Sequence, residues 1–336
     1  DTSLAALDFP HGEFRAGQRD IAEMTYKCIA TGGQLLLEAP TGIGKTAAVL
    51  FPALKALVTG KHERLVFTTA KTVGRRAAEQ ALDHFREAGF RGTALSLTAK
   101  ETICLSPGKA CHGDDCPYAR RYYDKLPDAL HAATEQASLT RQDIEALACR
   151  FEICPYELAA DLLPWVDIVI GDLHYVYSLY SSLVGAMESG GQRWSVLLDE
   201  AHNLPGRARD MYSARLSKAA LMRAKRGAPA QAARALDRVN RCLLAMQKSD
   251  WQSPQYHSQD ALPQRLLQKI TDFCAEVSAL LGEDPALLQR AGELGDFYFD
   301  ALHFLRVAQE WGSEYRCVMT RGQGAQSMVV ALNCLD

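Results

Sequence analysis

Residues 35–46, LLLEAPTGIGKT, decide the fold, because an apolar run leads directly into a glycine-rich loop and then into a helix-forming segment. Residues 39–46 (APTGIGKT) fit a phosphate-binding loop, except that Ala39 stands where the strict pattern has glycine. The glycines let successive backbone N–H groups point toward phosphate oxygens, and the helix start adds the positive end of its dipole. The stretch therefore predicts a nucleotide site between a buried strand and a helix.

The side chains of this loop have separate expected roles. Lys45 is expected to place a positive charge on the β- and γ-phosphates, and the Thr46 hydroxyl is expected to ligate Mg²⁺. The other loop residues expected to contact the nucleotide are Thr41, Gly42, Ile43 and Gly44.

A second motif follows another apolar run, where residues 195–198 (SVLL) lead into residues 199–202 (DEAH). Carboxylates that follow a buried strand lie at the carboxyl edge of a parallel sheet, where a phosphate-binding loop also lies. Asp199 is expected to hold Mg²⁺ through a water molecule, and Glu200 to orient or deprotonate the attacking water. His202 is placed to sense the γ-phosphate. The two motifs together predict nucleotide hydrolysis.

Short apolar runs bounded by Gly, Pro or charged residues indicate buried strands, and helical segments lie between the earlier ones. The expected strands cover residues 35–39, 65–69, 94–97, 166–171 and 195–198, and the expected helices cover residues 46–58 and 73–87. Alternating strands and helices predict an α/β fold with a parallel sheet. Two stretches break the alternation. Residues 99–164 interrupt the sheet, and residues 205–315 carry apolar residues at helical spacing and are expected to be helical.

Composition limits the possible functions. The chain has 336 residues, 48% of them apolar, with 37 Lys and Arg against 40 Asp and Glu, so its net charge is −3. That balance argues against coating of nucleic acid by the whole surface and leaves room for a local basic track. Residues 205–241 are strongly basic, and residues 242–315 are acidic. We see neither an apolar run long enough to span a bilayer nor a secretory leader.

Five of the ten cysteines gather within one stretch and predict a metal site. They are Cys104, Cys111, Cys116, Cys149 and Cys154. Four thiolates can hold either zinc or an iron–sulfur cluster, and their spacing alone leaves both open. The scattered cysteines are expected to be small buried hydrophobic residues.

With these motifs in place, the chain resembles the iron–sulfur DNA helicases of the XPD/DinG type, within superfamily two. The stretches that carry the resemblance are residues 14–19 (FRAGQR), 38–46 (EAPTGIGKT), 68–72 (TTAKT), 97–104 (LTAKETIC), 116–124 (CPYARRYYD), 153–157 (ICPYE) and 199–202 (DEAH). The resemblance covers residues 9–204 closely and residues 205–315 only by position. The stretch 116–124 is similar to the bacterial branch of the family.

The resemblance implies further site residues. Arg15 and Gln18 belong to the adenine-recognising motif, with Gln18 as the reader of the base. Thr68, Thr69 and Lys71 correspond to a motif that contacts single-stranded DNA. The ligands of a 4Fe–4S cluster are then Cys104, Cys111, Cys116 and Cys154, with Cys149 as an extra thiol or a substitute ligand. His174 stands where such helicases often have asparagine, and it either lines the strand path or packs.

The resemblance also implies a domain plan: a P-loop, RecA-like motor domain with two insertions. Residues 1–98 and 165–204 form the two parts of the first motor domain, and residues 316–336 return to it. Residues 99–164 form the iron–sulfur domain, and residues 205–315 form an all-helical arch.

The expected function is that of an ATP-dependent 5′→3′ DNA helicase in DNA repair, acting on single-stranded or forked DNA, with ATP, Mg²⁺ and a 4Fe–4S cluster as cofactors. We expect a monomer in the bacterial cytoplasm, without membrane association. The chain begins at Asp1, and neither the Ser-Ala-Thr motif nor the arginine finger of a second motor domain is found. We therefore expect a fragment that hydrolyses little ATP. The alternative is a single-strand-binding module that uses ATP as a switch and does not unwind by itself.

Overall fold

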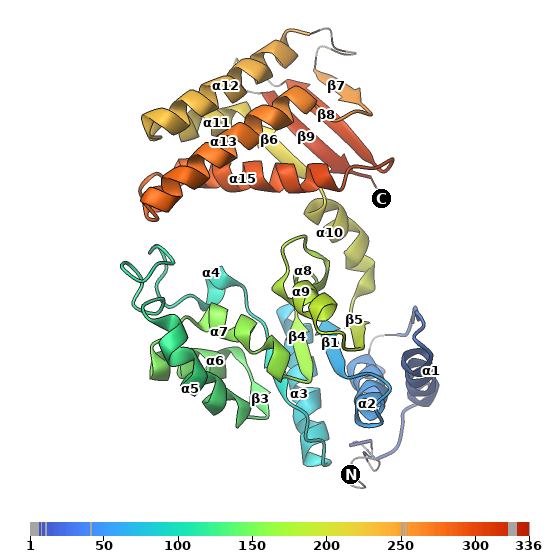
Figure 1. Ribbon diagram of the computed structural model, residues 1–336. Coiled ribbons are helices and arrows are strands. Elements are labelled where there is room, and N and C mark those ends of the chain that lie inside the picture. Colours follow the sequence, from blue (N-terminus) through green and yellow to red (C-terminus); the bar gives the residue numbers. More distant parts are fainter. Residues whose placement is uncertain are drawn as a thin grey trace. The chain divides into compact units, whose positions relative to one another are not determined.

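The structure is a computed structural model that describes residues 7, 9–10, 12–40, 42–249, 251, 253, 255–321 and 328–335. The chain divides into two compact units, which are described separately (Figure 1). The first unit consists of residues 1–107 and 117–204, and the second of residues 108–116 and 205–336. Within the described ranges, no helix combines the length and the apolar character that a membrane span requires.

A parallel sheet of five strands forms the centre of the first unit, in the order β3-β2-β4-β1-β5. The strands are β1 (Arg64–Thr68), β2 (Ala94–Ser96), β3 (Ser138–Leu139), β4 (Ile168–Gly171) and β5 (Trp194–Leu198). In the register of the sheet, Val66 of β1 lies between Val169 of β4 and Val196 of β5. The strands predicted near residues 65–69, 94–97, 166–171 and 195–198 are confirmed, as is the α/β class.

The helices of this unit alternate with the strands along the chain. They are α1 (Gln18–Thr31), α2 (Lys45–Val58), α3 (Thr72–Glu87), α4 (Lys100–Ile103), α5 (Tyr122–Thr134), α6 (Arg141–Phe151), α7 (Pro155–Asp161), η1 (Leu163–Trp165), α8 (His174–Tyr177), α9 (Ser182–Ser189) and η2 (Ala201–Asn203). The helices predicted over residues 46–58 and 73–87 correspond to α2 and α3.

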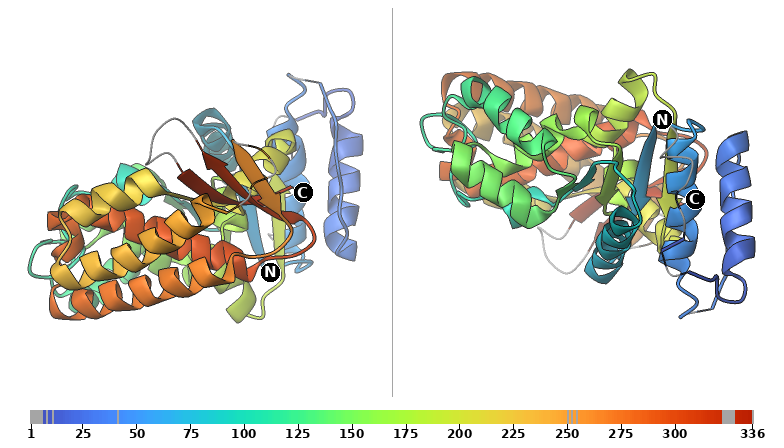
Figure 2. Two further views of the ribbon diagram at one scale, coloured as in Figure 1. Left: turned by 90° about the horizontal axis from the view of Figure 1, so that it is seen from above. Right: turned by 90° about the horizontal axis from the view of Figure 1, so that it is seen from below.

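Helices cover both faces of the sheet, because successive side chains of a strand point to opposite faces. Leu65 and Phe67 of β1 pack in one core with apolar residues of α2 and α3. Val66, between them, packs in a second core with residues of α5, α6 and α7. Seen from below, α2 and the helices α5 to α7 lie on different sides of the strands (Figure 2). Burial on both faces explains the continuous apolar runs of these strands.

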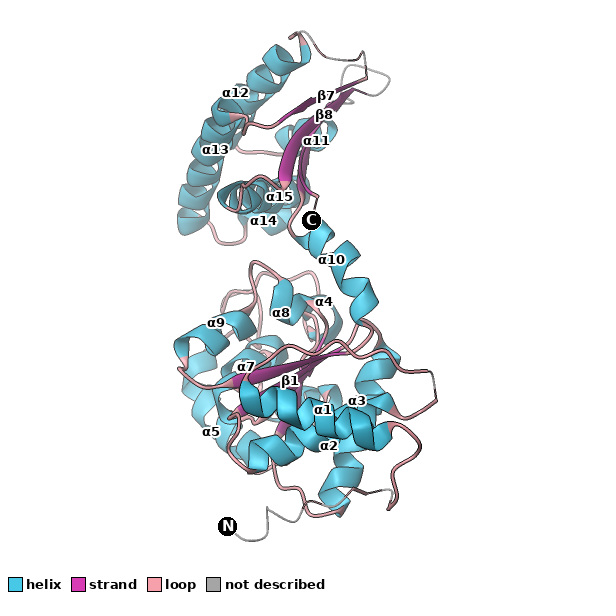
Figure 3. Ribbon diagram, turned by 90° about the vertical axis from the view of Figure 1, so that its right-hand side faces the viewer, coloured by secondary structure: helices cyan, strands magenta, loops and turns pink. Residues whose placement is uncertain are grey.

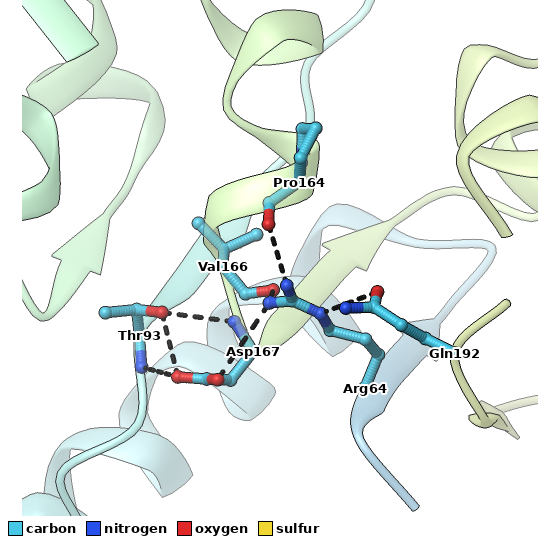
Figure 4. A network of polar contacts seen from close by, with 6 residues as sticks. All are labelled: Arg64, Thr93, Pro164, Val166, Asp167 and Gln192. Atoms are coloured by element: carbon cyan, nitrogen blue, oxygen red, sulfur yellow. Dashed lines mark hydrogen bonds and ion pairs between the residues drawn. The ribbon is translucent and has the colours of Figure 1, made fainter. Parts of the chain in front are cut away.

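A polar network joins the starting ends of the central strands (Figure 4). Arg64 donates to the carbonyl oxygens of Pro164, at 2.7 Å, and Val166, and its Nε donates to Gln192 Oε1 at 3.1 Å. Beside it, Asp167 Oδ2 accepts from the backbone N–H and the hydroxyl of Thr93, at 2.7 and 2.9 Å. These contacts satisfy polar groups at the edge of the sheet opposite to its carboxyl end.

The prediction of a strand over residues 35–39 is wrong. Residues 33–40 have no regular secondary structure, and the Leu36 side chain is 93% exposed. An apolar run becomes a strand only when a neighbouring strand satisfies its backbone groups, and no described strand pairs with this segment. The loop that follows it is therefore positioned by α2 and by side-chain contacts.

Residues 99–164 do not interrupt the sheet as expected. Their short strand β3 pairs with β2 at one edge, and Ile103, Ile144 and Leu158 share a core with Leu95 of β2. Most of this segment thus packs on the parallel sheet instead of forming a separate core. Residues 108–116 are the exception, because they group with the second unit.

The second unit contains an antiparallel sheet of four strands, in the order β6-β9-β8-β7. The strands are β6 (Ala214–Ser217), β7 (Tyr256–Gln259), β8 (Tyr315–Arg321) and β9 (Met328–Cys334). The helices are α10 (Leu204–Met211), α11 (Lys218–Arg226), α12 (Ala230–Gln247), α13 (Gln264–Glu283), α14 (Leu287–Arg290) and α15 (Gly292–Gln309). Figure 3 shows α12, α13 and α15 on the same side of the strands.

Two expectations for this unit are corrected. Residues 205–315 are not all helical, since β6 and β7 lie within them. Residues 316–336 do not return to the first unit, because β8 and β9 complete the sheet that β6 and β7 begin. Strand β6 pairs with β9, a partner more than 100 residues away, as Ala214 and Leu332 illustrate. Local periodicity carries no such information.

Candidate active site

Polar side chains gather at the carboxyl edge of the parallel sheet. Thr69, Asp172 and Asp199 come directly after β1, β4 and β5. Five residues separate the end of helix α2 from the start of β1, so the C-terminus of α2 lies near the starting edge of that strand. With 14 residues it is about 21 Å long, enough to carry its first residue, Lys45, back to the carboxyl edge. The two predicted motifs are therefore expected at one edge of the sheet.

The phosphate-binding loop is held closed by its own lysine. Lys45 Nζ donates hydrogen bonds to the carbonyl oxygens of Ala39, at 2.9 Å, and Pro40, at 3.2 Å. Gly42 and Gly44 adopt φ angles of 85° and 82°, which only glycine adopts easily. Thr46 follows Lys45 in the first turn of α2. Thr41, another predicted contact, lies outside the described residues.

Two residues of the motif at 14–19 brace this loop. Gln18 is 3% exposed; its Nε2 donates to the carbonyl oxygen of Ile43 at 2.6 Å, and its Oε1 accepts from the Arg15 N–H at 2.8 Å. Arg15 Nη1 donates to the carbonyl oxygen of Gly42 at 3.0 Å. A Cβ at Gly44 would lie 2.7 Å from Gln18 Nε2, so the close approach requires glycine. Sequence analysis expected contacts to adenine here and missed this supporting role.

The carboxylate motif is anchored to the neighbouring strand. The Asp199 N–H donates to the Thr68 carbonyl oxygen at 2.8 Å, and Thr69 Oγ1 donates to Asp199 Oδ2 at 3.3 Å. Glu200 adopts a left-handed conformation with φ 56°, which turns the chain sharply from β5 into η2. His202 Nδ1 lies 3.4 Å from Glu200 Oε2. Carboxylate and hydroxyl oxygens are the donors that Mg²⁺ prefers, so Asp199 and Thr46 fit this ion.

Gly74 and Asn203 are site residues that sequence analysis missed. A Cβ at Gly74 would overlap Thr69 Oγ1 and lie 3.1 Å from Asp199 Oδ2, so the first turn of α3 needs glycine there. A glycine inside an otherwise helical segment is the signal that could have identified this position. Asn203 Nδ2 donates to the Glu200 carbonyl oxygen at 3.1 Å and lies 3.2 Å from His202 Nε2.

The residues expected to contact single-stranded DNA differ in exposure. Thr68 is fully buried and donates to the Leu197 carbonyl oxygen at 3.3 Å, and Thr69 is 3% exposed. Lys71 is exposed at the N-terminal end of α3. His174 is also exposed, with Nδ1 2.7 Å from Asp172 Oδ1. Lys71 is thus the motif residue whose side chain is open to a ligand.

The predicted metal-binding cysteines are found in both units. Cys104 ends α4 and Cys154 begins α7, and these two helices are in contact within the first unit. Cys111 and Cys116 belong to the segment 108–116, which groups with the second unit. In the described part of the chain, no three His, Cys, Asp or Glu residues are arranged to hold a metal ion. A cluster shared by the four thiols therefore stays a prediction.

Comparisons with known proteins agree on one group. The family described as DEAD/DEAH box helicase matches residues 19–144, and the family DEAD_2 matches residues 92–221. The chain is 25% identical, over 234 residues, to "General transcription and DNA repair factor IIH helicase subunit XPD" of Arabidopsis thaliana, which covers 58% of this chain and 30% of that protein. It is 24% identical, over 259 residues, to the subunit XPD/RAD3 of Saccharomyces cerevisiae, with 66% and 33% covered.

A solved structure described as "XPD_Helicase" has a TM-score of 0.59 and 16% identity, and the match covers 96% of this chain and 54% of that one. At that identity the likeness concerns the fold alone, and the parallel sheet of the first unit is consistent with a RecA-like fold. The chain spans about a third of the length of these two curated relatives.

Proposed function

This chain is of the XPD type within helicase superfamily two, and from that premise we propose that it forms the ATP-binding part of a DNA helicase. The observation that carries the proposal is the contact between Thr69 and Asp199, which holds a carboxylate at the carboxyl edge of the sheet, where the phosphate-binding loop is also expected. An ATP-dependent motor needs these two elements at one edge, because the loop binds the phosphates and the carboxylates activate hydrolysis.

In the proposed mechanism, incoming phosphates take over the Lys45 ammonium from the carbonyl oxygens of Ala39 and Pro40. Thr46 and Asp199 would hold Mg²⁺, which would supply positive charge to the phosphates. Glu200 orients the attacking water and accepts its proton. His202, between Glu200 and Asn203, couples the state of the γ-phosphate to neighbouring segments.

The test is Mg·ATP binding by this chain, measured by titration. Lys45→Ala should weaken it by at least about tenfold, because a charge-assisted contact to phosphate is lost. Lys27→Ala, which removes an exposed lysine of α1, is the matched control and should leave binding unchanged. Equal affinities of the wild-type chain and Lys45→Ala would contradict the proposal.

The finer parts of the function are also proposals, and they are supported by the resemblance of the motifs. The whole protein is proposed to move 5′→3′ on single-stranded or forked DNA during DNA repair, with a second motor domain needed for full hydrolysis. Rapid DNA-stimulated hydrolysis by this chain alone would contradict that requirement. Binding of single-stranded DNA by the complete protein, without unwinding of a fork in the presence of ATP, would favour the alternative of an ATP-dependent binding module.

A 4Fe–4S cluster on Cys104, Cys111, Cys116 and Cys154 is proposed from their spacing and from the motifs around them. Iron and acid-labile sulfide should be measured in protein prepared without oxygen. Cys111→Ser should lose both, whereas Cys149→Ser, in a neighbouring exposed cysteine, should retain them. Wild-type protein that contains zinc and no iron would contradict this assignment.

A further inference from the structure

A pocket of about 840 Å³ lies in the second unit, between α12, α13 and the strands β7 and β8. It shares no residue with the candidate active site, and none of the helicase motifs described above contributes to it. Its volume is in the range of pockets that hold a small organic ligand and is far larger than a single inorganic ion needs.

The charged side chains that line this pocket are all basic. They are Arg238, Arg241, Arg265 and Lys269, and the lining includes neither Asp nor Glu among the described residues. The charges of two of these four side chains are compensated by ion pairs. Arg238 pairs with Glu276, and Lys269 pairs with Asp272 at 2.9 Å. The pKa of Asp272 is lowered, chiefly by its hydrogen bond from Lys269, so this carboxylate stays ionised and keeps its lysine paired.

Arg241 and Arg265 are different. Neither side chain makes a hydrogen bond or an ion pair within the described residues, and both residues lie exposed at the pocket. They come from facing helices, α12 and α13, and Arg265 belongs to the acidic stretch 242–315. By contrast, Arg223 and Lys225 of the basic section pair with Glu293 and Asp237. The fold therefore concentrates uncompensated positive charge at this pocket.

The remaining lining suits a flat, partly polar group. Met246, Leu266 and Met319 supply apolar surface, and Leu266 and Met319 are buried. Gln259 and Gln264 add amide groups that can both donate and accept. His257 contributes a ring whose buried Nδ1 has no hydrogen-bond partner among the described residues. A buried ring nitrogen without a partner is costly, so the fold leaves one polar group beside the pocket unsatisfied.

We propose that this pocket binds a nucleoside phosphate, with the phosphate on Arg241 and Arg265 and the base against the apolar wall beside His257. The ligand is either a free nucleotide or one nucleotide of a single strand, since both present the same chemistry. The proposal does not depend on ATP hydrolysis at the active site. Cations alone would suit any anion, but the apolar and amide surfaces favour a base over an acidic peptide.

The probes for the test are AMP and a five-nucleotide oligothymidylate, titrated into the full chain in EDTA so that Mg²⁺-dependent binding at the active site is suppressed. Arg241→Glu with Arg265→Glu should lower affinity at least about tenfold, because two charge-assisted contacts are reversed. Arg226→Glu with Arg234→Glu makes the same charge change on exposed arginines of α11 and α12 outside the pocket. This control should change affinity less than about twofold.

A second variant tests the pocket without a change of charge. Ala245→Trp places a large side chain in the pocket from an exposed position, and Ala230→Trp makes the same change at an exposed position outside it. Only Ala245→Trp should lower the affinity. Mg·ATP binding by each variant is the separate readout of the active site, and it should be retained, so failure of one proposal is distinguishable from failure of the other.

The two probes separate the two sources of the ligand. Tight binding of AMP supports a free nucleotide, and binding of the oligonucleotide alone supports a single strand. If the double variant at Arg241 and Arg265 and its control at Arg226 and Arg234 lose the same affinity, the proposal is overturned, because the attraction would then be nonspecific. Polyglutamate that competes as effectively as the oligonucleotide would also overturn it and would indicate an acidic peptide instead.

Discussion

Thr69 Oγ1 lies 3.3 Å from Asp199 Oδ2 and donates a hydrogen bond to it across the gap between the ends of β1 and β5. The two residues are far apart in the sequence and belong to two different predicted motifs. Thr69 is almost fully buried, so the bond fixes one carboxylate oxygen and leaves Oδ1 for other ligands. This relationship assigns Thr69 a positioning role in the nucleotide site, beside the contact to DNA that its motif implies.

Thr69→Val should therefore weaken Mg²⁺-dependent nucleotide binding by about tenfold, because a hydrogen bond to a charged group contributes about 1.5–3 kcal/mol. Thr69→Ser keeps the hydroxyl and should bind nearly as the wild type does. Titration of nucleotide at several Mg²⁺ concentrations measures the effect. If Thr69→Val and Thr69→Ser bind alike, the hydroxyl does not position Asp199.

Gly74→Ala should destabilise the first unit by about 1–3 kcal/mol, because the new Cβ would overlap Thr69 Oγ1 and crowd Asp199. The same change should weaken Mg·ATP binding. Gly185→Ala is the matched control: this glycine also lies in a helix, α9, and a Cβ there meets nothing within 4 Å. Urea unfolding should show it as stable as the wild type or slightly more so. Equal behaviour of the two variants would refute the packing argument.

Gln18→Ala should weaken the binding of ATP more than the binding of GTP. Loss of the bond to Ile43 loosens the loop for both nucleotides, and loss of the predicted base contact adds a penalty for ATP alone. Arg15→Ala removes only the side-chain bond to Gly42, so it should weaken the binding of ATP and of GTP equally. Arg19→Ala, an exposed neighbour, should change neither. Equal losses for ATP and GTP in Gln18→Ala would leave Gln18 as a support of the loop and end its role as a reader of adenine.

His62 should make the first unit less stable in mild acid. The side chain is 2% exposed, its Nε2 donates to the Ala53 carbonyl oxygen at 2.9 Å, and burial lowers its pKa below the ordinary value of 6.5. The unfolded chain therefore takes up a proton that the folded chain resists, and stability falls as the pH decreases through 6.5.

Melting temperatures between pH 8 and pH 5 measure this effect, with intermediate points to locate the midpoint of the decline. His62→Gln can still donate to Ala53 and does not titrate, so its decline should be shallower than that of the wild type. His131→Gln, at an exposed position, should keep the steeper decline. An unchanged slope in His62→Gln would assign the pH dependence to other groups.

Much of the first unit could be predicted from the sequence because the relevant information is local. Buried parallel strands require continuous apolar runs, and β1, β2, β4 and β5 lie within about two residues of the runs that predicted them. The carboxylates of residues 199–202 follow a strand directly, so covalent connection alone carries them to the sheet edge. Lys45 and Thr46 are the first two residues of α2, so their place at a helix start is also set by the local sequence.

Other features were not predictable, and each depends on a partner that is distant in sequence. Residues 35–39 have the composition of a strand but lack a described neighbour to pair with. The strand β6 is recognisable only beside β9, and Gly74 is required only because Thr69 and Asp199 approach it. The cysteine spacing indicated a metal site, and the four thiols are divided between two units, so that site stays a prediction.

The sequence by itself thus predicted a nucleotide site and determined the alternation of strands and helices, since both depend on residues that are neighbours along the chain. Only the tertiary structure decided which groups support that chemistry, namely Thr69 on Asp199 and Gln18 on the loop. It also decided that Arg241 and Arg265 face one pocket, although Arg265 lies in a stretch of net negative charge. The physical reason is that hydrogen bonding, steric contact and local charge depend on distance in space, which folding sets independently of separation along the chain.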